Sequence, residues 1–273
     1  MGVVMSVVKP RKIGRMRGIY LLPNLFTVAA LFAGFYAIIA SMKGRYEYAA
    51  IAILVAVILD GLDGRIARLL HAQSEFGAQL DSLSDMVSFG IAPALVMYTW
   101  SLAVMGKPGW LAAFIYAVCT ALRLARYNTQ ANNKRYFHGL STTAAAAFVA
   151  SIIWVCSTYD ITGEAIAVPM IVIAIILGLL KVSAIRYRSF KDLDIRNKVP
   201  FVAILVTVLI IVLVSFDPPD ILLILTFLYV ISGPVGMLWS LYKRRRAKKT
   251  QQYPQRWRRV LLKMLVPAIL PPH

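Results

Sequence analysis

The sequence predicts an all-α integral membrane protein, a polytopic bundle of about eight transmembrane helices. Three observations lead to this fold class: 59% of the 273 residues are hydrophobic, only 15% are charged, and the mean hydropathy is +0.70. Soluble domains usually carry about 25% charged residues. Apolar runs of about 20 residues, the length of a helix that crosses a bilayer, recur along nearly the whole chain. No separate soluble domain fits between them.

The expected spans follow one another with short polar connections. In chain order they cover residues 21–40, 48–70, 80–104, 110–126, 140–159, 165–185, 199–216 and 221–242. Pro93 lies inside the third span and predicts a kink there. The chain is thereby divided into a basic cytoplasmic arm over 1–20, a transmembrane domain over 21–242, and a basic cytoplasmic or interfacial tail over 243–273.

The basic residues predict the orientation of the bundle, because Lys and Arg concentrate on the cytoplasmic side of membrane proteins. With both termini in the cytoplasm, only Lys43, Arg45 and Lys107 of the 30 basic residues fall outside. The six basic residues from Lys181 to Lys198 are counted on the cytoplasmic side. Since the formal charge of +18 lies beside membrane spans, it indicates contact with anionic lipid, and no nucleic acid is expected as a partner.

Four aspartates lie inside the second and third expected spans, where a carboxylate costs about 2.5 to 3.5 kcal/mol. Asp60 and Asp63 are three residues apart, and Asp81 and Asp85 are four apart, so each pair projects from one helical face. A helical hairpin brings the pairs together, and the positive end of the third helix favours Asp81 and Asp85 in its first turns. Four convergent carboxylates are typical of a site for Mg2+ or Mn2+.

Small residues accompany the aspartates. Gly61, Gly64 and Gly77 lie beside them, although a glycine inside a helix costs about 1 kcal/mol relative to alanine. Alone, such glycines would favour a helix-packing surface. Together with the aspartates, with the small Ala67 and with Arg68 as a planar phosphate donor, they favour a site for a metal-bound diphosphate.

The pattern Asp60-x-x-Asp63-Gly64-x-x-Ala67-Arg68, followed after eight residues by Gly77-x-x-x-Asp81-x-x-x-Asp85, resembles the signature of the CDP-alcohol phosphotransferases. The resemblance implies a helical membrane enzyme that uses two divalent cations, Mg2+ or Mn2+. The implied metal ligands are Asp60, Asp63, Asp81 and Asp85. The implied CDP-binding and diphosphate-binding residues are Gly64, Ala67, Arg68 and Gly77. Asp85 is the general base by the same resemblance.

Three further stretches are similar to the subgroup of this family that transfers a phosphatidyl group from CDP-diacylglycerol to L-serine and releases CMP. They are LLPNLFT at 21–27, QSEFGAQLDSLSDMVSFGIAPA at 73–94 and ALRLARYN at 121–128. The segment FHGLSTTAAAA at 137–147 departs from the GLPSP expected there, and glycerol 3-phosphate or inositol phosphate stays open as the acceptor. By analogy, a homodimer in the bacterial cytoplasmic membrane is expected, with the active site on the cytoplasmic side.

Arg123 and Arg126 end the fourth expected span and are three residues apart, so both could point into one acceptor pocket. They would bind a serine carboxylate or a lipid phosphate, or act only as anchors on the cytoplasmic side. Asn128 could cap the helix or contact the substrate. A divalent-cation transporter is the alternative of another class, but it requires acids that reach both membrane faces. Here the acids within the membrane belong to one hairpin.

Overall fold

The computed structural model describes residues 21–70, 74–129, 139–185, 187 and 215–239, together with 242–243 and a few positions between 205 and 212. Within them every regular element is helical. In chain order the elements are α1 (Leu21–Met42), α2 (Tyr46–Leu69), α3 (Glu75–Asp85), the π-helical turn η1 (Met86–Ile91), α4 (Ala92–Trp100), the short η2 (Leu102–Met105), α5 (Lys107–Thr129), α6 (Thr142–Thr158), η3 (Gly163–Ile166) and α7 (Ala167–Val182). One further helix covers Pro218–Trp239.

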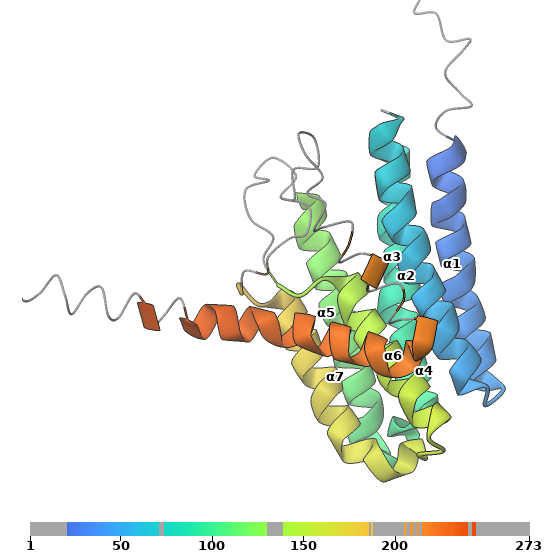
Figure 1. Cartoon of the computed structure of the whole chain (residues 1–273), viewed down its shortest axis with the longest axis vertical. Coiled ribbons are helices and arrows are strands. Elements are labelled where there is room, and N and C mark those ends of the chain that lie inside the picture. The colour runs from blue at the N-terminus through green and yellow to red at the C-terminus, as the bar shows by residue number, and fades with distance from the viewer. Residues whose placement is uncertain are drawn as a thin grey trace, which may run out of the picture.

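The helices from α1 to α7 stand side by side as a bundle, and the start of α1 lies at the same end as the ends of α2 and α5 (Figure 1). Within the described residues, five helices are long and apolar enough to cross a membrane: Leu22–Met42, Glu75–Trp100, Lys107–Thr129, Gly163–Val182 and Pro218–Trp239. The protein is therefore a helical membrane protein, as the composition predicts. Helix α2, which contains two aspartates, and the shorter α6 complete the bundle.

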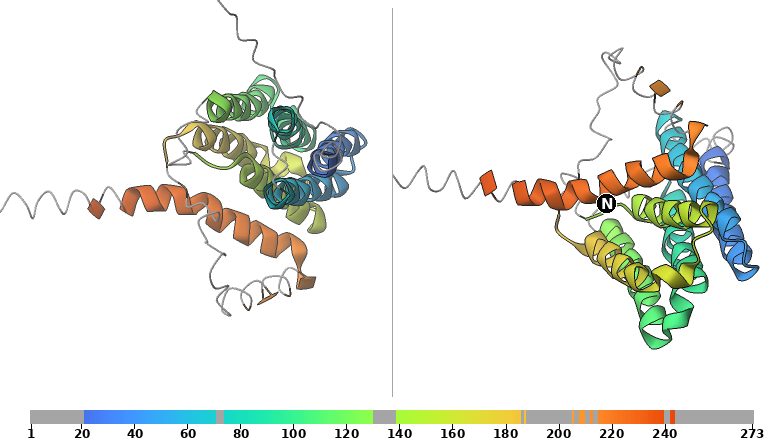
Figure 2. Two further views of the ribbon diagram at one scale, coloured as in Figure 1. Left: turned by 90° about the horizontal axis from the view of Figure 1, so that it is seen from above. Right: turned by 60° about the horizontal axis from the view of Figure 1, so that its bottom comes forward.

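The expected count of eight spans is not confirmed. The first six expected spans match the helices from α1 to α7, when α3, η1 and α4 are taken as one continuous helix. The span expected at 199–216 lies largely outside the described residues. The helix Pro218–Trp239 takes the place of the eighth span, but it lies across the bundle, along one side of it (Figures 1 and 2).

The third helix begins earlier than the sequence pattern predicts. Ser74 is its N-cap, with an extended backbone and a side chain that accepts a hydrogen bond from the Gly77 N–H at 3.0 Å. Such a cap satisfies a backbone donor that has no partner within the helix. Asp81 and Asp85 consequently lie about 9 Å and about 15 Å along the helix from Glu75, beyond the first turn where the helix dipole acts. The expected stabilisation of these two aspartates by the helix dipole is therefore wrong.

A π-helical turn interrupts the third helix directly after Asp85. Pro93 explains its position, because proline has no N–H and its ring clashes with the carbonyl four residues earlier, here that of Phe89. The Tyr116 hydroxyl of α5 donates to this Phe89 carbonyl at 3.3 Å. The sequence predicts a kink at Pro93, and the structure accommodates the proline with a turn of wider hydrogen bonding and a donor from a neighbouring helix.

Small residues let α1 approach its neighbours closely. The interface of α1 with α2 is lined by buried alanines, including Ala37 and Ala40 on α1 and Ala49 and Ala50 on α2. On another face of α1, a Cβ added to Gly34 would lie 2.6 Å from Ser88 Oγ. Close contact of helix backbones through small residues is a common way to hold a membrane bundle together. Here it fixes α1 against the two helices that carry the aspartates.

Candidate active site

Three of the four predicted aspartates converge. One carboxylate oxygen each from Asp60 and Asp63 of α2 and from Asp81 of α3 lies within 4.8 Å of the other two. Asp63 is 5% exposed, and the other two side chains are half-buried. The spacing on α2 and the return of the chain through the hairpin bring these oxygens together, as predicted. A set of carboxylate oxygens of this kind fits Mg2+ or Mn2+, which prefer oxygen ligands.

Asp85 lies beside this group, one turn beyond Asp81 on the same face of α3. Its half-buried carboxyl interacts electrostatically with those of Asp60, Asp81 and Asp63, in that order of strength. It does not belong to the set of three oxygens within 4.8 Å. The arrangement leaves Asp85 next to the place where a cation would bind and within electrostatic reach of Arg123 on α5.

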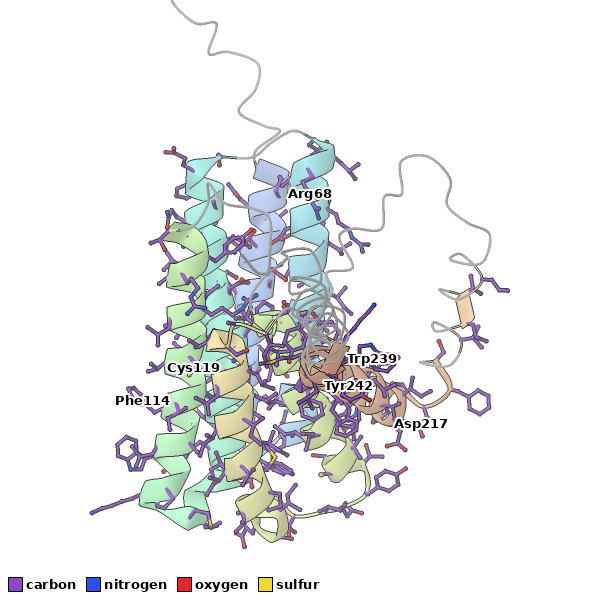
Figure 3. The ribbon with its side chains drawn as sticks, turned by 90° about the vertical axis from the view of Figure 1, so that its left-hand side faces the viewer. Arg68, Phe114, Cys119, Asp217, Trp239 and Tyr242 are labelled. Carbon is purple, nitrogen blue, oxygen red and sulfur yellow. The ribbon has the colours of Figure 1, made fainter. Side chains whose placement is uncertain are left out.

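The glycines of α2 line open space. A Cβ added to Gly61 or Gly64 would meet no atom within 4 Å, so neither glycine is needed for helix packing here. Arg68, toward the end of α2 (Figure 3), donates from Nε to the Gly64 carbonyl oxygen at 2.7 Å. Its guanidinium is thereby held beside Gly64, and Ala67 is half-buried on the adjoining turn.

Gly77 differs from the other two glycines because packing accounts for it. A Cβ at this position would lie 3.1 Å from Asn24 Oδ1 of α1 and 3.1 Å from Ser74 Oγ. Both contacts are tighter than ordinary van der Waals distances. The glycine thus lets the N-terminal turn of α3 close onto its own cap and onto α1.

The three predicted acceptor residues have different hydrogen-bond partners in the structure. Arg123 is half-buried, and its guanidinium interacts electrostatically with the Asp85 carboxyl. Its Nε is buried without a hydrogen-bond partner among the described residues, and its Nη1 makes only a long contact of 3.5 Å with Thr142 Oγ1. Arg123 therefore retains unused donor capacity next to the aspartates.

Arg126 and Asn128 are exposed and make local contacts. Arg126 Nη1 donates to the Val182 carbonyl at 3.1 Å, which satisfies the C-terminal end of α7. Asn128 Nδ2 donates to Ser82 Oγ at 3.1 Å, so it connects the end of α5 with the residue that follows Asp81. Arg126 and Arg123 thus have different hydrogen-bond partners among the described residues.

Lys181 is a fully buried basic side chain, although the charge pattern counts it only among the basic residues of the cytoplasmic side. It is the penultimate residue of α7, is fully buried, and donates from Nζ to Thr120 Oγ1 at 2.7 Å. The ammonium also lies 3.1 Å from the centroid of the Tyr116 ring, a cation–π contact. Its charge repels that of Arg123. Its position inside the expected span 165–185 agrees with this burial.

Thr27 of α1 is a second residue that the sequence analysis does not single out. Its hydroxyl donates to Asp63 Oδ2 at 2.8 Å, and both side chains are buried. The sequence signals for it are a hydroxyl within a mostly apolar span and its position at the end of the stretch LLPNLFT. The first predicted span therefore contributes directly to the aspartate site.

Comparison with known proteins agrees with this geometry. A family model described as CDP-alcohol phosphatidyltransferase matches residues 20–180. A CDP-diacylglycerol–serine O-phosphatidyltransferase of Helicobacter pylori is 33% identical over 227 residues, which cover 82% of this chain and 94% of the relative.

Two further relatives are similar over shorter stretches. A CDP-diacylglycerol–serine O-phosphatidyltransferase of Mycobacterium tuberculosis is 47% identical over 121 residues, 42% of each chain. An archaetidylserine synthase of Methanothermobacter thermautotrophicus is 33% identical over 172 residues, 61% of this chain and 69% of the relative. The family match covers the aspartates, the glycines, Arg123 and α6. The chain belongs to the CDP-alcohol phosphatidyltransferase family.

Proposed function

We propose that this protein transfers the phosphatidyl group of CDP-diacylglycerol to the hydroxyl of L-serine, giving phosphatidylserine and CMP. The observation that carries the proposal is the convergence of Asp60, Asp63 and Asp81 within 4.8 Å, next to glycines that face open space. The relatives from Helicobacter pylori and Mycobacterium tuberculosis are named for transfer to serine, which supports serine as the acceptor.

The proposed metal ligands are Asp60, Asp63, Asp81 and Asp85, which would hold two divalent cations, Mg2+ or Mn2+. When bound, the cations would neutralise the charge on the diphosphate and on the departing CMP. The chemistry of the donor set fits them, because carboxylate oxygens from two rigid helices supply hard ligands at fixed positions.

The CDP-diacylglycerol is proposed to lie against the surface formed by Gly64, Ala67 and Arg68, with Gly77 closing the start of α3. Asp63 lies about 9 Å along α2 from its end at Leu69, so the diphosphate must reach below the membrane surface. A lipid substrate can do this by entering sideways from the bilayer while its acyl chains remain in the hydrocarbon. The Arg68 guanidinium would then donate to a phosphate oxygen.

Asp85 is proposed as the general base. It would accept the proton from the serine hydroxyl as that oxygen attacks the phosphorus on the lipid side. Direct in-line attack needs no covalent intermediate on the enzyme. Arg123, next to Asp85 and with a buried Nε that lacks a partner among the described residues, would bind the serine carboxylate, with Arg126 and Asn128 at the edge of the same region.

The proposal includes the orientation of the bundle in the membrane and its oligomeric state. The start of α1, the end of α2 and the end of α5 lie at one end of the bundle, and we assign this end to the cytoplasmic face, with both termini, the arm over 1–20 and the tail over 243–273. A homodimer is proposed by analogy with the family. The mostly exposed apolar helix Pro218–Trp239 would supply surface for it or for contact with lipid.

The test is CMP release by the purified protein in detergent with CDP-diacylglycerol and Mn2+ or Mg2+, comparing L-serine, glycerol 3-phosphate and inositol phosphate. We expect release with serine only, and a loss of at least about 1,000-fold in Asp81→Asn, since the substitution removes a ligand from the cation site. Asp217→Asn, far from the cluster in sequence and exposed, is the matched control and should keep full activity.

Release with another acceptor would replace serine but leave the phosphotransferase chemistry in place. No release with any acceptor, combined with Mn2+ uptake into liposomes that contain the protein, would reject the enzyme in favour of a cation transporter.

A further inference from the structure

We infer that Thr27 is a positioning residue of the cation site, because this one residue of α1 hydrogen-bonds to both aspartate-bearing helices. The inference rests on the proposed function, since it assumes that Asp63 binds a divalent cation. It assigns a role to α1, which carries none of the proposed ligands.

Two hydrogen bonds place Thr27 between the helices. Its hydroxyl donates to Asp63 Oδ2 of α2 at 2.8 Å, and its backbone carbonyl accepts from Ser84 Oγ of α3 at 3.0 Å. Thr27 and Asp63 are each 5% exposed and Ser84 is 3% exposed, so water does not compete for these contacts. Ser84 directly precedes Asp85. One residue of α1 therefore fixes a carboxylate on α2 and the backbone position of α3.

The Thr27 hydroxyl has a second acceptor within reach, the Pro23 carbonyl at 3.2 Å. A threonine inside a helix commonly donates to the carbonyl four residues earlier, but it has only one proton to donate. The Asp63 oxygen is closer, and a carboxylate is the stronger acceptor. The contact with Asp63 therefore determines the rotamer, and the Pro23 carbonyl takes a minor share.

This contact orients the carboxylate. When one oxygen of Asp63 accepts from a fixed hydroxyl, the plane of the carboxylate is defined and the other lone pairs are directed toward the neighbouring aspartates. Hydrogen-bond partners of metal ligands typically change metal affinity or activity by about 10-fold to 100-fold when they are removed. Thr27→Val removes the donor and keeps the branched shape, so it isolates this effect from packing.

Ser88 offers a matched control in the same interface. Its hydroxyl donates to the Ala30 carbonyl at 3.1 Å, it is fully buried, and it connects α1 with the π-helical turn η1. Ser88→Ala therefore removes a buried hydrogen bond between α1 and the third helix without touching an aspartate contact. A purely structural role of Thr27 predicts similar behaviour for both variants.

The experiment measures Mn2+ binding to the full chain in detergent, by the electron paramagnetic resonance signal of free Mn2+, together with thermal melting of each variant. We expect Thr27→Val to weaken Mn2+ binding by about 10-fold to 100-fold. We expect Thr27→Ser, which keeps the donor, and Ser88→Ala to bind like the parent. The Mn2+ concentration for half-maximal CMP release should shift in parallel in Thr27→Val.

Parental Mn2+ affinity in a folded Thr27→Val would overturn the inference. If Thr27→Val does not fold, Ser84→Ala tests the other contact: weaker binding supports the role of Thr27, and parental binding overturns it. If the parent protein binds no Mn2+, the cation site does not exist and the proposed function fails together with the inference. Asp63→Asn distinguishes this case, because without a cation site this variant gives the same result as the parent.

Discussion

The two halves of the bundle bury opposite charges. Helices α2 and α3, held together by α1, place carboxylates in the membrane domain, whereas α5 and α7 place Arg123 and Lys181 there. Each half alone is unfavourable, since a buried charge must be compensated. The cationic half is partly compensated within the protein, because Lys181 lies over the Tyr116 ring and donates to Thr120.

The two halves differ in how far the protein itself compensates their charges. The acidic half gathers three carboxylate oxygens within 4.8 Å, an arrangement whose mutual repulsion bound cations would relieve. The cationic half contains one satisfied charge and one guanidinium with an unused donor. A substrate with a diphosphate at one end of the site and a carboxylate at the other would be stabilised by both halves.

After Asp81→Asn, the next largest effect is expected for Gly64→Ala, which changes the surface beside the aspartates of the acidic half. Because a Cβ here meets nothing in the protein and alanine favours the helix, the free energy of unfolding should rise by up to about 1 kcal/mol. The same methyl would occupy space proposed for the diphosphate, and kcat/KM for CDP-diacylglycerol should fall by about 10-fold to 100-fold, within the usual cost of overpacking. Thermal melting and CMP release measure the two effects. Lower stability with unchanged activity would show that Gly64 serves packing alone.

A second, smaller effect should follow from breaking the cationic half with Arg123→Gln. Removal of a charged donor to a carboxylate is expected to lower kcat/KM for serine by about 10-fold to 30-fold, because Arg123 is only half-buried and its contribution falls at the lower end of the range of about 1.5 to 3 kcal/mol for such hydrogen bonds. The KM for CDP-diacylglycerol should change little. Initial rates of CMP release at varied concentrations of each substrate separate these values. An equal change in both KM values would place Arg123 at the lipid substrate instead.

The smallest effect is expected for Arg126→Gln, the neighbouring arginine of α5. This side chain is exposed and donates to the Val182 carbonyl, so its loss should reduce stability by about 0.5 to 1 kcal/mol and leave the KM for serine within about twofold. The same rate measurements and a thermal melt test it. A change as large as that of Arg123→Gln would mean that the two arginines share one acceptor site after all.

The sequence predicts the helical part of the fold well, because bilayer thickness constrains the length and composition of each span. It predicts the position of the first six spans and the meeting of Asp60, Asp63 and Asp81, since helical spacing and a short hairpin determine both. It predicts an apolar helix of spanning length at Pro218–Trp239, but it does not predict that this helix lies across the bundle. Hydropathy reports that a helix avoids water, but its direction depends on packing partners.

The parts of the site that sequence misses depend on contacts between distant helices. Thr27 has the composition of an ordinary span residue, and only the fold reveals the Asp63 carboxylate beside it. Lys181 has the position of a cytoplasmic anchor, and only the approach of Tyr116 and Thr120 shows that it is buried. The start of the third helix depends on the cap at Ser74, a local signal that the search for apolar runs overlooks.

The π-helical turn η1 has a consequence for how relatives of this chain should align. Hydrogen bonding to the fifth residue instead of the fourth accommodates about one additional residue in the turn, and the helix after it faces the rest of the bundle as if that residue were absent. A protein that has the same aspartates but a regular α-helix at this point would align with a single-residue gap between Asp85 and Ala92. Such a gap would mark a difference in hydrogen bonding within one helix, with the active-site residues on one side and the packing residues on the other both kept in place.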